Sequence, residues 1–226
     1  MTTDNTYGKF IVFDGGEGAG KGAVLERLRS EDVLTNAVFT REPGGTPLAE
    51  RIRDMLLGES GSNMSPQTQF DLFWAARSDH IDQLIRPALL EGRHVVCDRF
   101  DSSTLAHQIK AQGHEDLLHL FWEMRKEHLK SIPQPFYIYL NVDPVVGLGR
   151  IKGRADANHF DNREIDYHFR VREGYLEFFR SASSFNAPLA NHERGSNFDY
   201  RIIDANRPLE EVVSEALSIV TKVCSS

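Results

Sequence analysis

The chain has 226 residues, 40% of them hydrophobic, and a formal net charge of −7 at pH 7. That length suits one α/β domain with a substantial core, and the acidic balance argues against a general nucleic-acid binder, whose affinity would come from a basic face. No run approaches the ~20 apolar residues of a membrane span, the polar N-terminus lacks a signal core, and two cysteines give no disulfide framework. We therefore expect one cytoplasmic domain over residues 1–226, with neither nucleic acid nor membrane as partner.

Short apolar runs alternate with longer helical patterns along the chain. The expected strands are Phe10 to Asp14, Ala37 to Thr40, His94 to Asp98, Phe136 to Asn141 and Tyr200 to Asp204. The expected helices are Lys21 to Ser30, Pro47 to Leu57, Pro66 to Leu90, Glu115 to Lys130, Pro144 to Gly149, Glu164 to Arg180 and Pro208 to Val223. This alternation predicts a parallel sheet covered by helices on both faces, with ligands at the carboxyl ends of its strands. Residues 181–199, rich in Ser, Asn, Ala and Gly, indicate an extended surface loop.

A glycine-rich turn and a lysine follow the first expected strand. The match is to G-x-x-x-x-G-K-[ST], in which backbone N–H groups and the lysine surround the phosphates of a nucleoside triphosphate. The phosphate-binding residues are Gly15, Gly16, Glu17, Gly18, Ala19, Gly20, Lys21 and Gly22. Gly22 stands where a Ser or Thr normally ligates Mg²⁺, so the pattern is complete for phosphate and incomplete for metal. A plain tight turn is the alternative, but the strand before it favours a nucleotide site.

A second glycine pair, Gly44 and Gly45, follows the second expected strand, just after Arg41. These glycines would let the backbone approach a ligand closely, and Arg41 could bind that ligand. The plainer interpretation is a turn into a helix, with Thr46 as the N-cap and Pro47 at the first helical position. The two interpretations are compatible, and we expect both.

The third expected strand ends in Asp98 and Arg99. An acid at this place can bind Mg²⁺ directly or through a water, as the second acidic element of P-loop enzymes does. The Arg99 guanidinium can hold a phosphate with two hydrogen bonds. A surface ion pair of little consequence is the alternative, but the position at the edge of a parallel sheet favours a functional role.

Two further segments carry side chains that could bind a nucleobase or phosphates. Phe73 and Arg77 lie four residues apart on one helical face, where a ring and a guanidinium suit a nucleobase, although a helical Phe taken alone more often belongs to a core. The basic segment Arg150 to Arg154 could fold over phosphates and exclude water, although a solvated charge run is the default.

The sequence shows no recognisable pair of nucleophile and general base. This agrees with transfer to another phosphate, a reaction that needs fixed cations rather than a base.

These segments occur together in the order of one family. The chain resembles the thymidylate kinases, especially the bacterial type, in Gly15 to Lys21, Phe39 to Thr46, Phe73 to Arg77, Asp98 with Arg99, Ser103 and Gln108, and Arg170 to Leu176. The resemblance covers nearly the whole chain. It implies a P-loop NTPase fold, a three-layer α/β/α domain with a five-stranded parallel sheet and a short lid at about residues 150–163. It also implies transfer of the γ-phosphate of ATP to dTMP, giving dTDP, with Mg²⁺, in a homodimer.

The resemblance also implies roles for single residues. Glu17 would face the 3′ hydroxyl of the deoxyribose, Phe73 would stack on thymine and Arg77 would hydrogen-bond the edge of the base. The remaining substrate residues are Arg41 and Arg99 for the acceptor phosphate, and Thr104 and Gln108 in the thymine pocket. The catalytic residues are Lys21, Asp98 as the metal ligand, Arg99, and the lid cations Arg150, Lys152 and Arg154.

The chain departs from the family pattern at four places. Gly22 and Ala23 replace the usual hydroxyl residues after the P-loop lysine, and His159 replaces a lid arginine. His107 stands where many members have Tyr, and residues 109–112 replace a glycine-rich turn beside the thymine pocket. Two alternatives therefore stay open: a nucleotide-binding protein with weakened transferase activity, and a kinase for another deoxynucleoside monophosphate.

Overall fold

The computed structural model describes residues 7–58, 61, 63–151, 163–185 and 199–225. Its centre is a five-stranded parallel sheet in the order β2-β3-β1-β4-β5. The strands are β1 (Phe10–Gly15), β2 (Val38–Arg41), β3 (Val95–Asp98), β4 (Phe136–Asn141) and β5 (Tyr200–Asp204). All five predicted strands are confirmed, and β4 and β5 have the predicted bounds.

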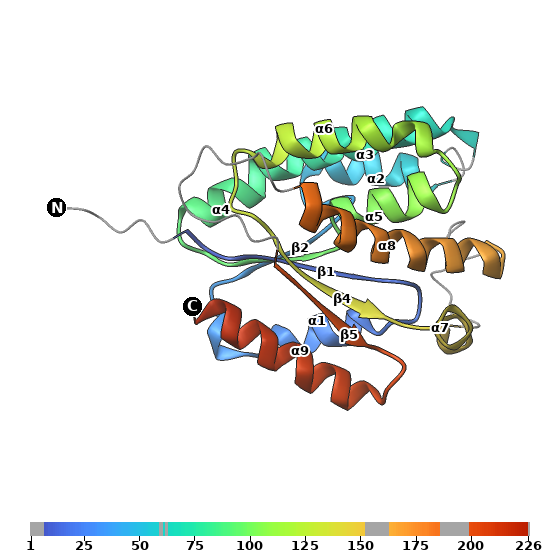
Figure 1. Cartoon of the computed structure of the whole chain (residues 1–226). Coiled ribbons are helices and arrows are strands. Elements are labelled where there is room, and N and C mark those ends of the chain that lie inside the picture. The colour runs from blue at the N-terminus through green and yellow to red at the C-terminus, as the bar shows by residue number, and fades with distance from the viewer. Residues whose placement is uncertain (1–6, 59–60, 62, 152–162, 186–198, 226) are drawn as a thin grey trace.

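Helices cover both faces of the sheet, as Figure 1 shows. One face carries α1 (Lys21–Leu28) and α9 (Leu209–Cys224). The helices on the other side are α2 (Pro47–Leu57), α3 (Pro66–His80), α4 (Arg86–Leu90), α5 (Asp101–Thr104), α6 (Leu118–Leu129) and α8 (Ile165–Phe185), and α7 (Pro144–Ile151) follows β4. Short 3-10 turns are η1 (Asp32–Leu34) and η5 (Glu115–Leu117). The predicted three-layer α/β/α architecture is confirmed.

Alternating side chains of the strands divide the interior into two cores. Phe10 and Val12 of β1 pack in the core beneath α3, α6 and α8, whereas Ile11 and Phe13 pack in the core beneath α1 and α9. This period of two is what a strand buried on both faces requires. Among the described residues, no helix combines the length and apolar character needed to cross a membrane.

Two π-helical segments lie on the side of the sheet that carries α3. The expected helix over residues 66–90 consists of α3, the π segment η3 (Ile81–Ile85) and α4. The second π segment, η4 (Leu105–Lys110), continues α5, and the sequence did not predict a helix there. The preceding helix, α5, has the sequence DSST, and Asp, Ser and Thr favour caps and turns over helix interiors. Since π turns are frequent at functional sites, both segments draw attention to the residues beside them.

Two predicted loops need correction. The surface loop predicted for residues 181–199 was wrong at its start, because α8 continues to Phe185. Extending a formed helix by a few residues is favourable even for Ser and Ala, since the costly nucleation is already complete. Likewise α7 includes Arg150 and Ile151, so the predicted lid at residues 150–163 begins inside a helix. Residues 152–162, which include the predicted lid residues Lys152, Arg154 and His159, and residues 186–198 lie outside the described part of the chain.

Candidate active site

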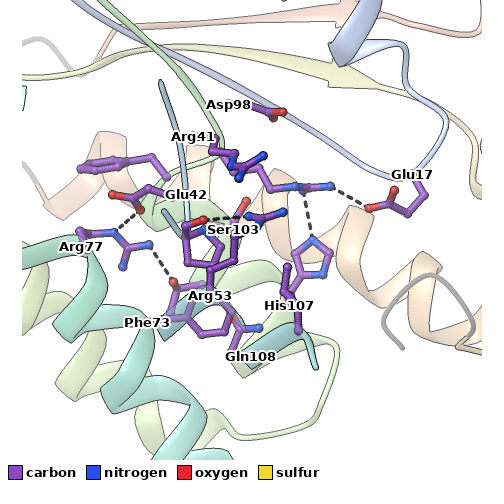
Figure 2. Close-up of a pocket in the computed structure, with 15 residues that line it drawn as sticks. Glu17, Arg41, Glu42, Arg53, Phe73, Arg77, Asp98, Ser103, His107 and Gln108 are labelled. Atoms are coloured by element: carbon purple, nitrogen blue, oxygen red, sulfur yellow. Dashed lines mark hydrogen bonds and ion pairs between the residues drawn. The ribbon is translucent and has the colours of Figure 1, made fainter. Parts of the chain in front are cut away.

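The carboxyl ends of three neighbouring strands meet at one pocket, which Figure 2 shows. Strand β3 lies between β2 and β1, and its last residue, Asp98, is the register partner of both Arg41 and Phe13. Side chains from α2, α3, α5 and η4 complete the wall. The lining residues are Glu17, Arg41, Glu42, Pro43, Arg53, Leu57, Phe73, Arg77, Asp98, Arg99, Phe100, Ser103, Thr104, His107 and Gln108. The structure therefore brings all seven predicted substrate-binding residues to one place.

The P-loop between β1 and α1 has the backbone that a phosphate site requires. Gly18 has φ of 70° and Gly20 has φ of 88°, a region that side chains disfavour. A Cβ on Gly18 would lie 2.0 Å from the carbonyl oxygen of Gly147, so the loop admits only glycine there. Gly20 gives α1 no side-chain cap, which leaves N–H groups at the start of the helix for an anion. This cradle fits the phosphates of a nucleoside triphosphate.

Lys21 lies at the first position of α1. Its Nζ donates a 3.4 Å hydrogen bond to the carbonyl of Gly15. Desolvation lowers the pKa of Lys21, and the positive charge of Arg99 lowers it further. The next residue, Gly22, is exposed, and a Cβ placed on it would meet no atom within 4 Å. Position 22 thus has room for a hydroxyl side chain that this chain lacks.

Arg99 connects the P-loop to the pocket. Its NH1 donates to the Gly15 carbonyl at 3.1 Å and to the Tyr175 hydroxyl at 2.9 Å, and its NH2 donates to Glu17 Oε1 at 2.7 Å. Its φ of 69° is the only positive value at a non-glycine position in the described chain. Such a conformation costs about 1–3 kcal/mol and persists where the surroundings fix it. The guanidinium is therefore held in place before any anion reaches it.

Arg77 is fixed on two sides. Its Nε donates to Glu42 Oε2 at 2.8 Å and its NH2 donates to Thr104 Oγ1 at 3.1 Å. The guanidinium lies 4.5 Å from the ring centre of Trp74 and 5.2 Å from that of Phe100, a stacking that suits its flat shape. Its NH1 is buried and has no hydrogen-bond partner in the part of the chain that the structure describes. A buried unpaired donor beside a pocket calls for an acceptor on a ligand.

Phe73 belongs to a core and also lines the pocket. Its side chain is only 9% exposed and packs with Ala49, Ile52 and Leu56 in a small core between α2 and α3. It also lines the pocket, one helical turn before Arg77. Its ring can therefore support a base while it stabilises the helix pair.

Asp98 presents a second unpaired polar atom. Its Oδ1 is buried and has no hydrogen-bond partner among the described residues. The described chain holds no group of three or more His, Cys, Asp or Glu side chains that could enclose a metal ion. One available carboxylate oxygen fits Mg²⁺ nevertheless, because this ion commonly keeps several waters and binds through one or two carboxylates plus phosphates of the substrate.

Arg53 and Asp14 are among the residues around the pocket that sequence reasoning missed. Arg53 of α2 lines it, and its NH1 donates to the Pro43 carbonyl at 2.8 Å. Asp14 lies behind it, fully buried, and accepts hydrogen bonds from Ser102 Oγ and Ser103 Oγ; desolvation raises its pKa. An acid inside the apolar run of β1 was a legible signal for Asp14. Arg53 had only its helical spacing of three from Glu50 to suggest that it faces the Arg41 loop.

His107 lies against Arg99. Its Nε2 is 3.5 Å from Arg99 NH1, and its Nδ1 is 3.1 Å from the Tyr167 hydroxyl. Desolvation and the positive charge of Arg99 lower the pKa of His107 to about 3. The ring is therefore neutral near pH 7. Because Arg99 only donates, Nε2 accepts and Nδ1 carries the proton.

Arg150 has a different setting from the pocket residues. Its guanidinium donates to three carbonyl oxygens, those of Gly18 at 3.3 Å, Ala205 at 2.8 Å and Asn206 at 3.2 Å. It thereby ties α7 to the P-loop and to the turn after β5. The pocket lining does not include it. Its predicted catalytic role would require these bonds to be exchanged for phosphate oxygens.

Comparisons with known proteins agree with one another. The family model for thymidylate kinase matches residues 13–216. A thymidylate kinase of Haemophilus ducreyi is 34% identical over 226 residues, covering 98% of this chain and 97% of the relative. One of Caulobacter vibrioides is 40% identical over 177 residues, covering 77% and 84%. The crystal structure of thymidylate kinase from Ehrlichia chaffeensis matches with a TM-score of 0.67 and 24% identity over 95% of this chain and 99% of that one, a likeness in fold.

Proposed function

This chain belongs to the thymidylate kinase family, and we propose that its pocket binds dTMP, which accepts the γ-phosphoryl group of ATP to give dTDP and ADP. The observation that carries the assignment to this pocket is the pair of buried, unpaired polar atoms in its wall, Arg77 NH1 and Asp98 Oδ1. One is a donor beside an aromatic ring, as a nucleobase site needs. The other is an acceptor beside the P-loop, as a metal site needs.

The chemistry of Arg77 favours a keto pyrimidine. A guanidinium has donors and no acceptors, so its free NH1 pairs with the 4-carbonyl oxygen of thymine or uracil. The 4-amino group of cytosine would bring a donor against that donor. A site built around a buried hydrogen-bonding group rejects the mismatched ligand strongly, because the group is then left unpaired. We therefore expect dTMP and dUMP to be accepted and dCMP to be rejected.

Three arginines provide the cations for the acceptor phosphate. Arg41, Arg53 and Arg99 all line the pocket and approach it from β2, α2 and the end of β3. Their charges offset the repulsion between two nucleotides whose phosphates must approach in line. An acceptor phosphate is already anionic near neutral pH, so no side chain has to remove a proton from it. This explains why the pocket needs cations rather than a general base.

The P-loop would hold the triphosphate of ATP at its N–H groups and Lys21. Asp98 would hold a magnesium ion directly or through a water, and the ion would supply positive charge beside the phosphates. Gly22 provides no hydroxyl for it, so more of its coordination would fall to water. Other residues of the chain position the two arginines that would bind dTMP: Glu17 and Tyr175 hold Arg99, and Glu42 and Thr104 hold Arg77.

An acceptor panel tests the proposal. The purified chain is incubated with ATP and dTMP, dUMP, dCMP or dGMP, with and without Mg²⁺, and products are separated by ion-exchange chromatography. We expect dTDP and ADP from dTMP in the presence of Mg²⁺ and at least about 100-fold lower kcat/KM for dCMP. No dTDP at high enzyme concentration, or turnover of dCMP equal to that of dTMP, would overturn the assignment.

Two further expectations stay predictions. A homodimer is supported by the exposed apolar side chains Leu48 and Met55 on α2, which are 43% and 48% exposed, and light scattering of the purified chain tests it. A cytoplasmic location agrees with the free thiols Cys97 and Cys224.

A further inference from the structure

We propose that His80 is a positioning residue, which fixes the orientation of Arg77 by holding the opposite oxygen of Glu42. This inference rests on the proposed function, in which Arg77 binds the base. His80 has no exposed surface and does not line the pocket, so it cannot touch dTMP. Its effect on the substrate must pass through its neighbours.

The carboxylate of Glu42 is held between two side chains of α3. Arg77 Nε donates to Oε2 at 2.8 Å, and His80 Nδ1 lies 3.1 Å from Oε1. Arg77 and His80 are three residues apart, so both project from one helical face toward the loop after β2. Glu42 is 5% exposed and Arg77 is 2% exposed. Hydrogen bonds to both oxygens fix the rotation of this carboxylate about its last bond.

The hydrogen-bond directions along this chain of residues are determined by chemistry. Arg77 can only donate, and an ionised carboxylate can only accept, so His80 Nδ1 must donate to Glu42. The other ring nitrogen, Nε2, lies 2.7 Å from Thr40 Oγ1 on β2. In the neutral ring Nε2 accepts from the Thr40 hydroxyl. The imidazole is thus clamped between β2 and the loop, and each of its nitrogens has a partner.

The backbone packs against this clamp. Gly45 has φ of 88°, and a Cβ on it would lie 2.4 Å from Thr40 Oγ1 and 2.5 Å from His80 Nε2. The glycine therefore allows the loop to close over the Thr40–His80 pair. The packed ring holds Glu42 at Oε1, and Glu42 in turn holds Arg77 at Nε, which helps to keep NH1 beside the pocket. Small displacements of such a group lower affinity because the bound geometry must be exact to a fraction of an ångström.

Substitution of His80 tests the inference in the full-length protein. His80→Ala removes the donor to Glu42. We expect the KM for dTMP to rise about 10-fold or more, the range for losing a hydrogen bond to a charged group. The kcat and the KM for ATP should stay within about 2-fold, since no ATP-binding group is touched. Selectivity for dTMP over dCMP should fall, because a misplaced NH1 no longer favours the 4-carbonyl.

Two matched variants separate positioning from stability. His80→Asn places an amide N–H near the position of Nδ1. Its KM for dTMP should therefore be close to that of the unsubstituted chain. Phe70→Leu changes a fully buried residue of the same helix, and it should lower the melting temperature without changing selectivity. If His80→Asn behaves like His80→Ala, or if Phe70→Leu lowers selectivity as much, His80 has only a structural role and the inference is wrong.

A double-mutant cycle tests the path through Arg77. If His80 acts through Glu42 and Arg77, His80→Ala should add less than about 2-fold to the KM of Arg77→Gln. Independent, multiplying effects would overturn the inference. Its failure is distinguishable from that of the proposed function, which fails if the unsubstituted chain does not phosphorylate dTMP at all.

Discussion

Glu17 Oε1 lies 2.7 Å from Arg99 NH2, and this ion pair joins the P-loop to the end of β3. The two side chains are only 19% and 21% exposed, so solvent screens the pair less than it screens a surface pair. The other terminal nitrogen of Arg99, NH1, donates to the carbonyl oxygen of Gly15. The loop that would hold ATP and the arginine that would hold dTMP are therefore one connected unit.

Replacing Glu17 by Gln should show what this unit contributes. The amide still accepts a hydrogen bond from Arg99 but no longer offsets its charge. We expect kcat/KM for dTMP to fall about 10-fold to 100-fold, in line with a hydrogen bond between charged groups. Steady-state kinetics at fixed, saturating ATP measure this.

A substrate lacking the 3′ hydroxyl separates the two roles of Glu17. If Glu17 also contacts that hydroxyl, 2′,3′-dideoxythymidine monophosphate should be a poor substrate of the unsubstituted chain and should lose little more with Glu17→Gln. Equal losses for both substrates would show that Glu17 acts only through Arg99.

Gly22→Ser should supply the hydroxyl that the P-loop lacks. The space around position 22 is open, so the side chain enters without displacing any atom. We expect the Mg²⁺ concentration for half-maximal activity to fall about 3-fold to 10-fold, because one more ligand reaches the ion. A magnesium titration at constant ATP and dTMP measures the change.

Gly22→Ala is the control for that variant. Both substitutions replace a glycine inside α1 and should raise the free energy of unfolding by roughly 0.5–1 kcal/mol. Only the serine carries a hydroxyl. If the two variants have the same magnesium dependence, the missing hydroxyl does not limit this enzyme.

The parts of the site that could be predicted are those that follow from topology. In a parallel sheet, the carboxyl ends of strands meet at one edge, so Arg41 and Asp98 were expected at the same edge once their two strands were recognised. The apolar runs were clear because each strand is buried on both faces. The P-loop was clear because its glycines serve a backbone conformation that few other residues adopt.

The parts that could not be predicted depend on contacts between segments that are distant in sequence. Tyr175 holds Arg99 across 76 residues, and His80 holds Glu42 across 38. No local pattern records such pairs. The α5–η4 helix was missed for a related reason, since packing against α8 stabilises a segment whose Asp, Ser and Thr residues disfavour a helix on their own.

Asp98→Asn tests the unpaired oxygen. Asparagine has nearly the same shape but no charge to offer a metal ion. We expect kcat to fall about 100-fold or more, since loss of a metal-stabilising group costs several kcal/mol at the transition state, and we expect the magnesium requirement to rise. Asp82→Asn, at an exposed site on η3 that pairs with Arg86, should change neither. Equal kcat in the Asp98 variant and the unsubstituted chain would exclude a role for this carboxylate.

His107 should make the folded protein less stable in mild acid. Its pKa is about 3 in the folded protein against 6.5 for a free histidine. Between these values the unfolded chain binds more protons than the folded protein does. The contribution of His107 to the free energy of unfolding is therefore complete above pH 6.5 and is lost as the pH falls toward 3. From pH 7.5 to pH 5 the loss should be about 1–2 kcal/mol. Urea unfolding of the unsubstituted chain and of His107→Gln at both pH values isolates this contribution, because other groups, including Asp14, titrate in both proteins and cancel in the difference. An equal loss in the two proteins would mean that Arg99 and the surrounding wall do not keep this ring neutral.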